Sequence, residues 1–273
     1  MCNFVSVRTI VGGLMAAGVL FGCSSTTQEG AVGVHRSQLM LVSSEQMNEG
    51  ARTEYAKLVQ GAQSQGALNH DERQTRRVQE IARRLIPHVA VYRQDAVKWQ
   101  WEVAVLTSKE VNAWCMPGGK MAVYTGLIDA LNITDDELAA VMGHEIAHAL
   151  REHSRERASR VVASQTAVGI GAAVLGVGQI GASLGNAVAQ ATFTLPNSRE
   201  QESEADHMGV ELAARAGYDP RAAVGLWEKM GKLTGGGSSP SFMSTHPSPE
   251  FRARDLTNYA QRVQPLYEAA RKR

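Results

Sequence analysis

The spacing of apolar residues divides the chain into mainly helical segments around one strand-rich stretch. Between residues 43 and 90, apolar positions recur at helical intervals, as in Val78, Ile81 and Leu85, and the run stops at Pro87. This pattern predicts two or three helices. Residues 249–272 have a similar pattern and predict one more helix.

Between these helical parts the apolar positions change to a period of two. The alternation from Val97 to Leu106 predicts a half-buried strand. Two further strands are predicted at Val111–Met116 and Met121–Thr125, on either side of the turn-forming sequence Pro117-Gly118-Gly119. The predicted fold class is therefore α+β, mainly helical, with a small β-sheet.

A helix predicted from about Asp135 to about His153 contains the most informative motif of the chain. Thr134 and Glu137 form a capping box at its start. The helix includes the sequence His144-Glu145-Ile146-Ala147-His148, which is an HExxH motif. Residues four apart share a helix face, so the two histidines can bind one metal ion and the glutamate can reach a metal-bound water.

Two histidines leave a catalytic metal site incomplete, because such a site carries three protein ligands and a water. Glu202 is the favoured third ligand, and Asp206, one helical turn later, is placed to orient a ligating imidazole. His153 is another candidate for the third ligand, but it does not stand at the spacing after His148 that a metzincin requires. We interpret it as an exposed histidine near a basic helix end. Glu200 and Glu204 stay open as alternative ligands.

Several other motifs occur in an order that resembles one family of zinc peptidases. They are Val111–Trp114, Pro117–Lys120, Val123–Leu127, the Glu202/Ala205/Asp206 signature, and Ser244–Pro247 with Arg252 following. The chain resembles the zinc metallopeptidase family of HtpX, BepA and LoiP, the Ste/Oma-type gluzincins. Within that family it is similar to LoiP-like outer-membrane lipoprotein metalloproteases.

The resemblance implies a zincin-type (gluzincin) catalytic domain, with the small sheet beside the HExxH helix and one Zn²⁺ ion per chain. It implies that His144, His148 and Glu202 bind the zinc. It also implies that Glu145 is the general base and that Asp206 orients a ligand from behind.

The resemblance adds two expectations about the substrate side of the site. His246 is expected to face the site, where it either stabilises the developing oxyanion or caps the metal in a closed state. The segment Met121, Ala122, Val123, Tyr124 and Thr125 is the best candidate for an exposed edge strand that holds an extended peptide by main-chain pairing. A strand paired on both sides is the alternative.

The first residues predict export and lipidation. An apolar run from Ile10 to Phe21 is too short to span a membrane, and Gly22-Cys23 completes a sequence that looks like a bacterial lipobox. We therefore predict a lipoprotein signal peptide over residues 1–22, a lipidated flexible tether over residues 23–36 and a peptidase domain over residues 37–273. Ser24, by resemblance to bacterial lipoproteins, indicates an outer-membrane anchor at Cys23, facing the periplasm.

Charge and cysteine content restrict the classes of partner. Removal of residues 1–22 leaves 27 of the 28 basic residues beside 27 acidic ones, so no basic field indicates nucleic-acid binding. Cys115 is then the one cysteine besides Cys23, which argues against an internal disulfide. We expect Cys115 to be a small buried residue.

The stretch Val161–Ser198 contains no charged side chain and is rich in Ala and Gly. Polar residues such as Gln165, Gln179 and Asn186 interrupt its apolar run, so a closely packed helical hairpin or a lid is favoured over a membrane-spanning helix. Because the stretch lies between the two halves of the metal motif, we hypothesise that it gates the site.

The resemblance implies a zinc-dependent metalloendopeptidase of the bacterial cell envelope that hydrolyses misfolded or unassembled periplasmic and outer-membrane proteins. Expected partners are these unfolded substrates, the membrane through lipidated Cys23, and the outer-membrane assembly machinery. The alternative is an envelope assembly chaperone or adaptor with a latent or structural zinc site, in which His246 is a permanent fourth ligand.

Overall fold

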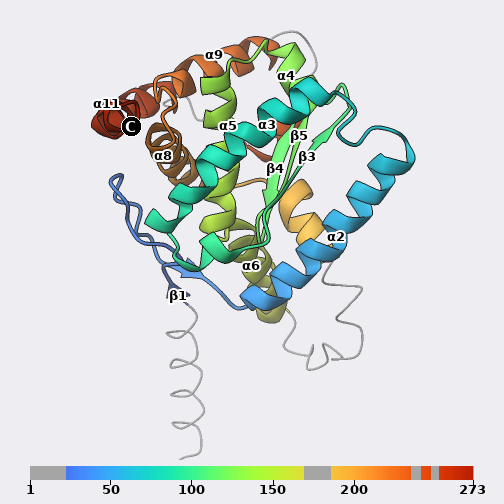
Figure 1. Cartoon of the computed structure of the whole chain (residues 1–273). Coiled ribbons are helices and arrows are strands. Elements are labelled where there is room, and N and C mark those ends of the chain that lie inside the picture. Colours follow the sequence, from blue (N-terminus) through green and yellow to red (C-terminus); the bar gives the residue numbers. More distant parts are fainter. Residues whose placement is uncertain (1–22, 169–185, 235–240, 247–251, 273) are drawn as a thin grey trace, which may run out of the picture.

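The computed structural model describes residues 23–168, 186–234, 241–246 and 252–272, which form a helical frame around one three-stranded sheet (Figure 1). The elements follow in chain order: β1 (Cys23–Ser24), β2 (Gln38–Leu39), α2 (Ser44–Ser64), α3 (Glu72–Leu85), η1 (Ile86–Val91), η2 (Asp95–Lys98), β3 (Glu102–Leu106), β4 (Ala113–Met116), β5 (Lys120–Tyr124), α4 (Thr125–Ala130), α5 (Asp135–Leu150), α6 (His153–Val168), η3 (Gln190–Thr194), α8 (Arg199–Arg215), α9 (Ala222–Thr234), α10 (Ser241–Thr245) and α11 (Arg252–Ala270). The predicted α+β class, mainly helical with a small sheet, is confirmed.

The sheet has the strand order β3-β5-β4. β5 pairs in parallel with β3 and antiparallel with β4, so Met121 faces Val103 on one side and Cys115 on the other. The prediction that Met121–Thr125 is an exposed edge strand is therefore wrong. Its physical reason is that β3, from earlier in the chain, adds to the free side of the hairpin formed by β4 and β5. The edge position next to the site belongs to β4.

The prediction of a strand from Val97 to Leu106 is also wrong for its first half. Residues 95–98 form the 3₁₀ helix η2, and β3 begins only at Glu102. Glu102 pairs with Lys120, and the residues before Lys120 belong to a turn in which Gly118 and Gly119 have positive φ. Residues before Glu102 therefore have no strand to pair with. Two of their alternating apolar residues, Trp99 and Trp101, pack against the main core instead.

Alternation along the strands sorts their side chains into two layers. On β4, Ala113 and Cys115 join the large core around α5, whereas Trp114 and Met116 join a smaller core under α2. Tyr55 of α2 packs edge-on against Trp114, with 6.1 Å between ring centroids. Helix α2 thus covers the outer face of the sheet, and α5 lies against the inner face (Figure 1).

Helix α5 is the central element of the domain and packs against α3, α8, α9 and β4. It begins as predicted: the Thr134 side chain accepts a hydrogen bond from the N–H of Glu137, whose carboxylate accepts one from the N–H of Thr134. It ends at Leu150, three residues earlier than expected. Glu152 takes a left-handed conformation, with φ of 52°, which stops the helix and turns the chain into α6.

The residues predicted as a flexible tether are packed onto the domain. We call residues 24–39 the N-terminal segment. Val32 and Val34 are buried in the core, and the N–H groups of Ala31 and Val32 donate to the buried carboxylate of Glu211 at 2.8 and 3.1 Å. The prediction of flexibility is wrong here, because the short polar sequence finds hydrogen-bond partners on α6 and α8 that sequence spacing does not reveal.

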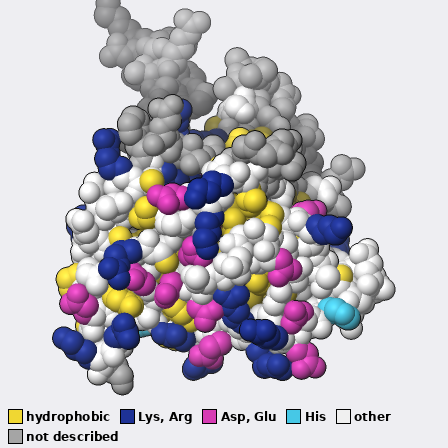
Figure 2. All heavy atoms as spheres, turned by 90° about the horizontal axis from the view of Figure 1, so that it is seen from above, with side chains coloured by type: hydrophobic (Ala, Val, Ile, Leu, Met, Phe, Trp, Pro, Cys, Tyr) yellow, Lys and Arg dark blue, Asp and Glu magenta, His cyan; other side chains and the backbone are white. Residues whose placement is uncertain are grey.

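The uncharged stretch Val161–Ser198 is only partly described. Residues 169–185 lie outside the described residues, so the hairpin, the lid and the gating hypothesis stay predictions. Within the described part of the chain, no helix is both long and apolar enough to cross a membrane. On the face shown in Figure 2, basic and acidic side chains are interspersed, and hydrophobic side chains form small separate groups.

Candidate metal centre

The HExxH helix and the helix with the acidic signature cross at two glycines. A Cβ atom added at Gly143 of α5 would lie 2.7 Å from the carbonyl oxygen of Gly209 on α8. A Cβ atom at Gly209 would lie 2.6 Å from the backbone nitrogen of His144. Only glycine fits such a close approach of two backbones. The crossing places Glu202 and Asp206 directly beside the two histidines.

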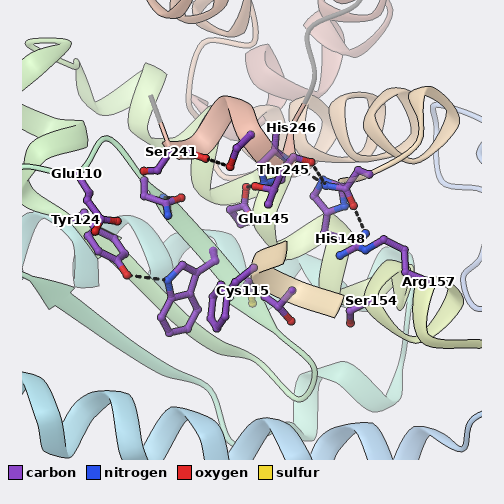
Figure 3. Close-up of a pocket in the computed structure, with 17 residues that line it drawn as sticks. Glu110, Cys115, Tyr124, Glu145, His148, Ser154, Arg157, Ser241, Thr245 and His246 are labelled. Carbon is purple, nitrogen blue, oxygen red and sulfur yellow. Dashed lines mark hydrogen bonds and ion pairs between the residues drawn. The ribbon is translucent and has the colours of Figure 1, made fainter. Parts of the chain in front are cut away.

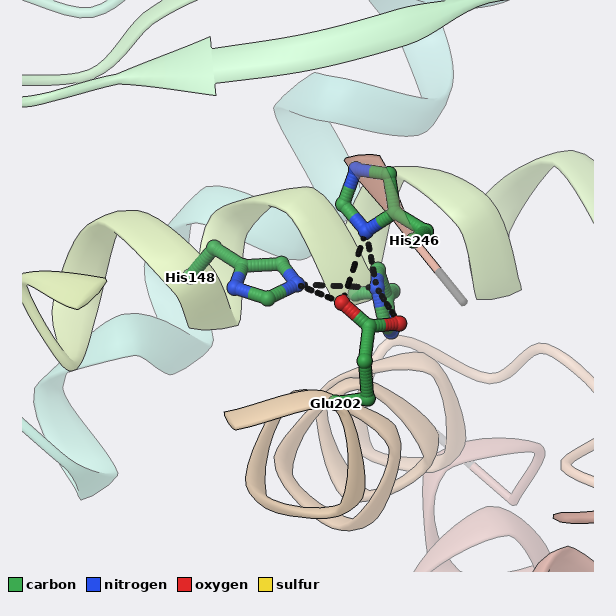
Figure 4. Close-up of side chains that lie close together, drawn as sticks. His148, Glu202 and His246 are labelled. Carbon is green, nitrogen blue, oxygen red and sulfur yellow. Dashed lines mark hydrogen bonds and ion pairs between the residues drawn. The ribbon is translucent and has the colours of Figure 1, made fainter. Parts of the chain in front are cut away.

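Four side chains converge at this crossing, namely His144, His148, Glu202 and His246. Figure 4 labels the last three of them. One donor atom from each lies within 4.8 Å of the others, and all four residues are buried. The Nε2 atoms of His144 and His148 are 3.0 Å apart, and His148 Nε2 lies 3.3 Å from Glu202 Oε1. His246 Nδ1 lies 2.9 Å from the same carboxylate oxygen.

The donor atoms suit zinc in spacing and in chemistry. Ligands about 2.0–2.1 Å from a tetrahedral zinc ion stand about 3.3–3.4 Å apart, close to the separations in this cluster. Burial lowers the pKa of His148 well below its usual range, which keeps the imidazole neutral as a ligand requires. Burial opposes ionisation of Glu202, but His246, His148 and His144 outweigh it and hold the Glu202 pKa well below its usual range.

Asp206, one turn after Glu202 on α8, lies behind His144. Its Oδ1 atom is 3.0 Å from His144 Nδ1, so the imidazole Nε2 is directed toward the cluster. Arg252 binds Asp206 at 2.7 Å and Glu202 at 2.9 Å, and its guanidinium lies 3.2 Å from the ring centroid of Trp227. The sequence analysis assigned no role to Arg252. The one hint of its importance was its position after the family motif Ser244–Pro247.

Glu145 faces a cleft rather than the interior of the cluster (Figure 3). The cleft has a volume of about 280 Å³ and is lined on one side by Ala113, Trp114 and Cys115 of β4. Glu145 Oε1 is buried and has no hydrogen-bond partner among the described residues; His246 Nε2 lies 3.5 Å away. Burial raises the Glu145 pKa, partly opposed by the nearby histidines. An unpaired carboxylate oxygen beside a metal cluster is suited to accept a proton.

His246 reaches the cluster from the short helix α10. The main-chain N–H of His246 donates to the carbonyl of Phe242 at 3.0 Å, and the two rings stack with centroids 4.2 Å apart. Asn197, which sequence reasoning missed, donates its backbone N–H and its side-chain N–H to the Thr245 carbonyl at 2.9 and 3.1 Å. His246 thus faces the site, as expected, and its role is taken up below.

The structure separates the candidate carboxylates. Only Glu202 joins the cluster; Glu200 is exposed, and Glu204 binds two arginines behind the site. The interpretation of His153 as an exposed histidine is wrong: it is fully buried, with its Nδ1 atom 2.7 Å from His148 Nδ1. The reason is the turn at Glu152, which directs His153 back onto the end of α5.

Cys115 is buried, as predicted, and burial raises the pKa of its thiol well above the usual range. His207 bonds Asp255 at 2.6 Å and stacks on Tyr259, so it points away from the cluster.

The chain is similar in sequence to several known metallopeptidases. The mitochondrial metalloendopeptidase OMA1 of Arabidopsis thaliana is 38% identical over 172 residues, which cover 62% of this chain and 33% of the relative. The metalloprotease YcaL of Escherichia coli (strain K12) is 33% identical over 149 residues, 54% of this chain and 57% of the relative. The beta-barrel assembly-enhancing protease of the same bacterium is 27% identical over 211 residues, 73% of this chain and 41% of the relative.

The chain spans 33%, 48% and 50% of the length of the OMA1 proteins from Arabidopsis thaliana, Schizosaccharomyces pombe and Saccharomyces cerevisiae. The sequence model of peptidase family M48 matches residues 72–260, which include all four residues of the cluster and Glu145. Zinc is the cofactor of that family, and the donor set described above fits it. The chain belongs to peptidase family M48.

Proposed function

We propose that the protein is a zinc-dependent endopeptidase of the bacterial cell envelope. The observation that carries the proposal is the Glu145 carboxylate, which lines a cleft beside a cluster of three histidines and one carboxylate that could hold a metal ion. A site built only for structure needs ligands alone, whereas a hydrolytic site also needs an acidic side chain that faces the substrate cleft beside the metal, and Glu145 has that position.

His144, His148 and Glu202 are the proposed zinc ligands, and Glu145 is the proposed general base. Bound zinc lowers the pKa of a water ligand to about 7 and polarises the scissile carbonyl. Glu145 accepts a proton from the attacking water and delivers it to the leaving amine. The Nε2 atom of His246, 3.5 Å from Glu145 Oε1, faces the same cleft and is placed to donate to the developing oxyanion.

The edge strand β4 gives an extended peptide a place beside Glu145. Ala113, Trp114 and Cys115 line the cleft together with Glu145, and β5 is the one strand paired with β4 among the described residues. A substrate strand can therefore pair with the free side of β4. We propose β4, in place of Met121–Thr125, as the strand that holds the substrate.

The envelope setting rests on the lipobox at Cys23 and on two bacterial relatives, one of which is named a beta-barrel assembly-enhancing protease. We propose that Cys23 is lipidated and anchors the protein in the outer membrane, facing the periplasm. The proposed substrates are misfolded or unassembled periplasmic and outer-membrane proteins, near the assembly machinery that handles them. β1 begins at Cys23, so this anchor would adjoin the folded domain.

Cleavage of an unfolded protein tests the enzymatic part of this proposal. Casein is incubated with the full mature protein and with Glu145→Gln, and zinc content is measured for both. We expect wild type alone to cleave, at equal zinc content, with a loss of about 100- to 10,000-fold in kcat for the variant. Equal cleavage by both proteins would remove Glu145 from the mechanism.

Membrane fractionation tests the proposed location. Wild type is expected with the outer membrane, and Cys23→Ser, which cannot be lipidated, is expected to leave it. A Cys23→Ser protein that stays in the outer-membrane fraction would contradict the lipid anchor.

A second candidate function is a chaperone or adaptor with a latent zinc site. The observation in its favour is His246 Nδ1, which lies 3.3 Å from His144 Nε2 and can occupy the fourth ligand position. If neither wild type nor Glu145→Gln cleaves casein while both hold zinc, this candidate is preferred. Activity that appears in His246→Ala would then identify the site as latent rather than structural.

A further inference from the structure

The two histidines of HExxH are supported from behind in different ways. His144 Nδ1 meets a carboxylate directly, that of Asp206 at 3.0 Å. His148 Nδ1 instead meets another imidazole, that of His153 at 2.7 Å. The second ring nitrogen of His153, Nε2, lies 3.0 Å from Glu204 Oε2. His148 therefore reaches its carboxylate through an intervening histidine.

The distances allow only one arrangement of protons if His148 binds a metal through Nε2. A neutral His148 with a free Nε2 lone pair carries its proton on Nδ1 and donates it to His153 Nδ1. His153 must then carry its own proton on Nε2, where it donates to Glu204. The chain from His148 to Glu204 thus fixes both the ring orientation and the tautomer of His148.

Two arginines hold the carboxylate at the far end of this chain. Arg151, whose side chain is fully buried, donates to Glu204 Oε1 at 2.9 Å. Arg36 donates to both oxygens of Glu204, at 3.1 and 3.0 Å, and also binds Glu156. Because Arg36 belongs to the N-terminal segment, the support of His148 includes residues that precede the matched family region at residue 72.

We infer that His153 and Glu204 are positioning residues for His148, and that the N-terminal segment completes their support through Arg36. This inference rests on the proposed role of His148 as a zinc ligand. Partners of this kind affect metal affinity by about 10- to 100-fold when they are replaced. Through Arg36, the N-terminal segment would therefore contribute to the support of the metal site, besides leading to the proposed lipid anchor.

The test measures the zinc affinity of the full mature protein by competition with a chelator. His153→Leu removes both hydrogen bonds, and we expect zinc affinity to fall about 10- to 100-fold. His153→Gln keeps one acceptor and one donor, and should recover most of the loss. If His153→Leu does not fold, Glu204→Gln takes its place, since it keeps size and removes the charge. Wild-type zinc affinity in whichever of these two variants folds would overturn the inference.

The contribution of the N-terminal segment is tested by Arg36→Met beside Glu211→Gln. Glu211 holds the same segment through Ala31 and Val32 but contacts no member of the chain from His148 to Glu204. We expect Arg36→Met to lower zinc affinity severalfold, and Glu211→Gln to lower the unfolding temperature with little effect on zinc affinity. Equal losses of zinc affinity in both variants would mean that Arg36 acts only through general stability, and would overturn its assigned role.

Zinc affinity is measured without any hydrolysis, so the experiments can contradict the endopeptidase activity and the positioning of His148 independently of each other. A wild type that binds zinc and does not cleave casein contradicts the endopeptidase, while the positioning of His148 is still decided by the variants. A wild type that binds no zinc would overturn both.

Discussion

The helix pair that carries the proposed zinc ligands and the short helix that carries His246 are built in opposite ways. α5 and α8 have 16 and 17 residues, are buried along most of their length and touch backbone to backbone at Gly143 and Gly209. α10 has five residues and is held near the site by hydrogen bonds to Asn197 and to the carbonyl of Val111.

This difference indicates which groups need fixed positions. His144, His148 and Glu202 must keep mutual distances within a few tenths of an ångström to bind one ion, and mid-helix positions in a packed pair provide that rigidity. His246 is held by the Glu202 carboxylate at 2.9 Å, by a few hydrogen bonds and by one ring stack, and not by a long packed helix. We therefore expect His246 to be the exchangeable member, and the following predictions test this contrast, beginning with the largest effect.

The largest expected effect is the loss of zinc from the helix pair. His144→Ala removes one of three ligands that share fixed helices, so the purified protein should contain little zinc. His246→Ala leaves three ligands and should still bind about one zinc per chain. Metal analysis after dialysis measures both. If His246→Ala loses zinc as completely as His144→Ala, the contrast between fixed and exchangeable ligands is wrong.

The next effect concerns the ion pairs behind the helix pair. Burial opposes ionisation of Glu156, but hydrogen bonds from Arg36, Gln201 and Gln38 outweigh it and hold its pKa well below the usual 4.5. Because the folded-state pKa is depressed, this stabilisation is present above pH 4.5 and is lost as the pH falls through the folded-state value. Glu156→Gln removes one of the two carboxylates that bind Arg36, which keeps Glu204, and should cost about 2–3 kcal/mol at pH 7.

Urea unfolding at several pH values checks this prediction. The gap between wild type and Glu156→Gln should narrow as the pH falls below 4.5, because only wild type loses the contribution of this carboxylate. The control is Glu80→Gln on α3, which removes a solvent-exposed pair with Arg83 and should change stability little. A gap that stays constant down to acid pH would show that the Glu156 carboxylate is not the source of the stability.

A smaller effect is expected at the helix crossing. Gly209→Ala introduces a Cβ atom 2.6 Å from the backbone nitrogen of His144, and overpacking of this kind costs about 1–3 kcal/mol. The control is Gly61→Ala, since a Cβ atom at Gly61 of α2 meets nothing within 4 Å and should stabilise the helix slightly. Thermal unfolding with zinc analysis measures both. A Gly209→Ala protein with wild-type stability and zinc affinity would mean that the two helices can separate freely.

The smallest expected effect concerns the hydrogen bonds from Asn197 that keep His246 near the cluster. Asn197→Ala removes the side-chain hydrogen bond to the Thr245 carbonyl and should cost about 1 kcal/mol. It should also let a chelator remove zinc somewhat faster, in the same direction as His246→Ala but to a smaller extent. Stopped-flow chelation measures the rates. Slower zinc removal from Asn197→Ala would contradict the view that Asn197 holds His246 on the cluster.

Local signals along the chain predicted the helix that carries the site. The capping box at Thr134 predicted where α5 begins, and the spacing of HExxH placed two imidazoles on one helix face. Helical spacing and the chemistry of metal ligands predicted that Asp206 orients a ligating imidazole, and the structure places it beside His144. These inferences depend on residues within a few turns of one another, so they hold without knowledge of the remaining fold.

The order of the strands in the sheet could not be predicted from such local signals. Alternation predicted the first strand and the turn at residues 117–119 predicted the next two, but the choice of β5 as the edge, which the family resemblance suggested, was wrong. Neither signal distinguishes a central strand from an edge strand. Strand order depends on which chain segment adds to each side of a hairpin. That choice is made by contacts between residues far apart in sequence.

By itself the sequence determined the α+β class, the family-type metal motif, and four residues that come together at the proposed zinc site. Only the tertiary structure decided that His153 contacts His148, that Arg252 binds Glu202 and Asp206, and that Arg36 of the N-terminal segment binds Glu204. The physical reason is that buried charges and hydrogen bonds are satisfied by whichever groups the fold brings near. Their spacing in the sequence carries no record of that choice.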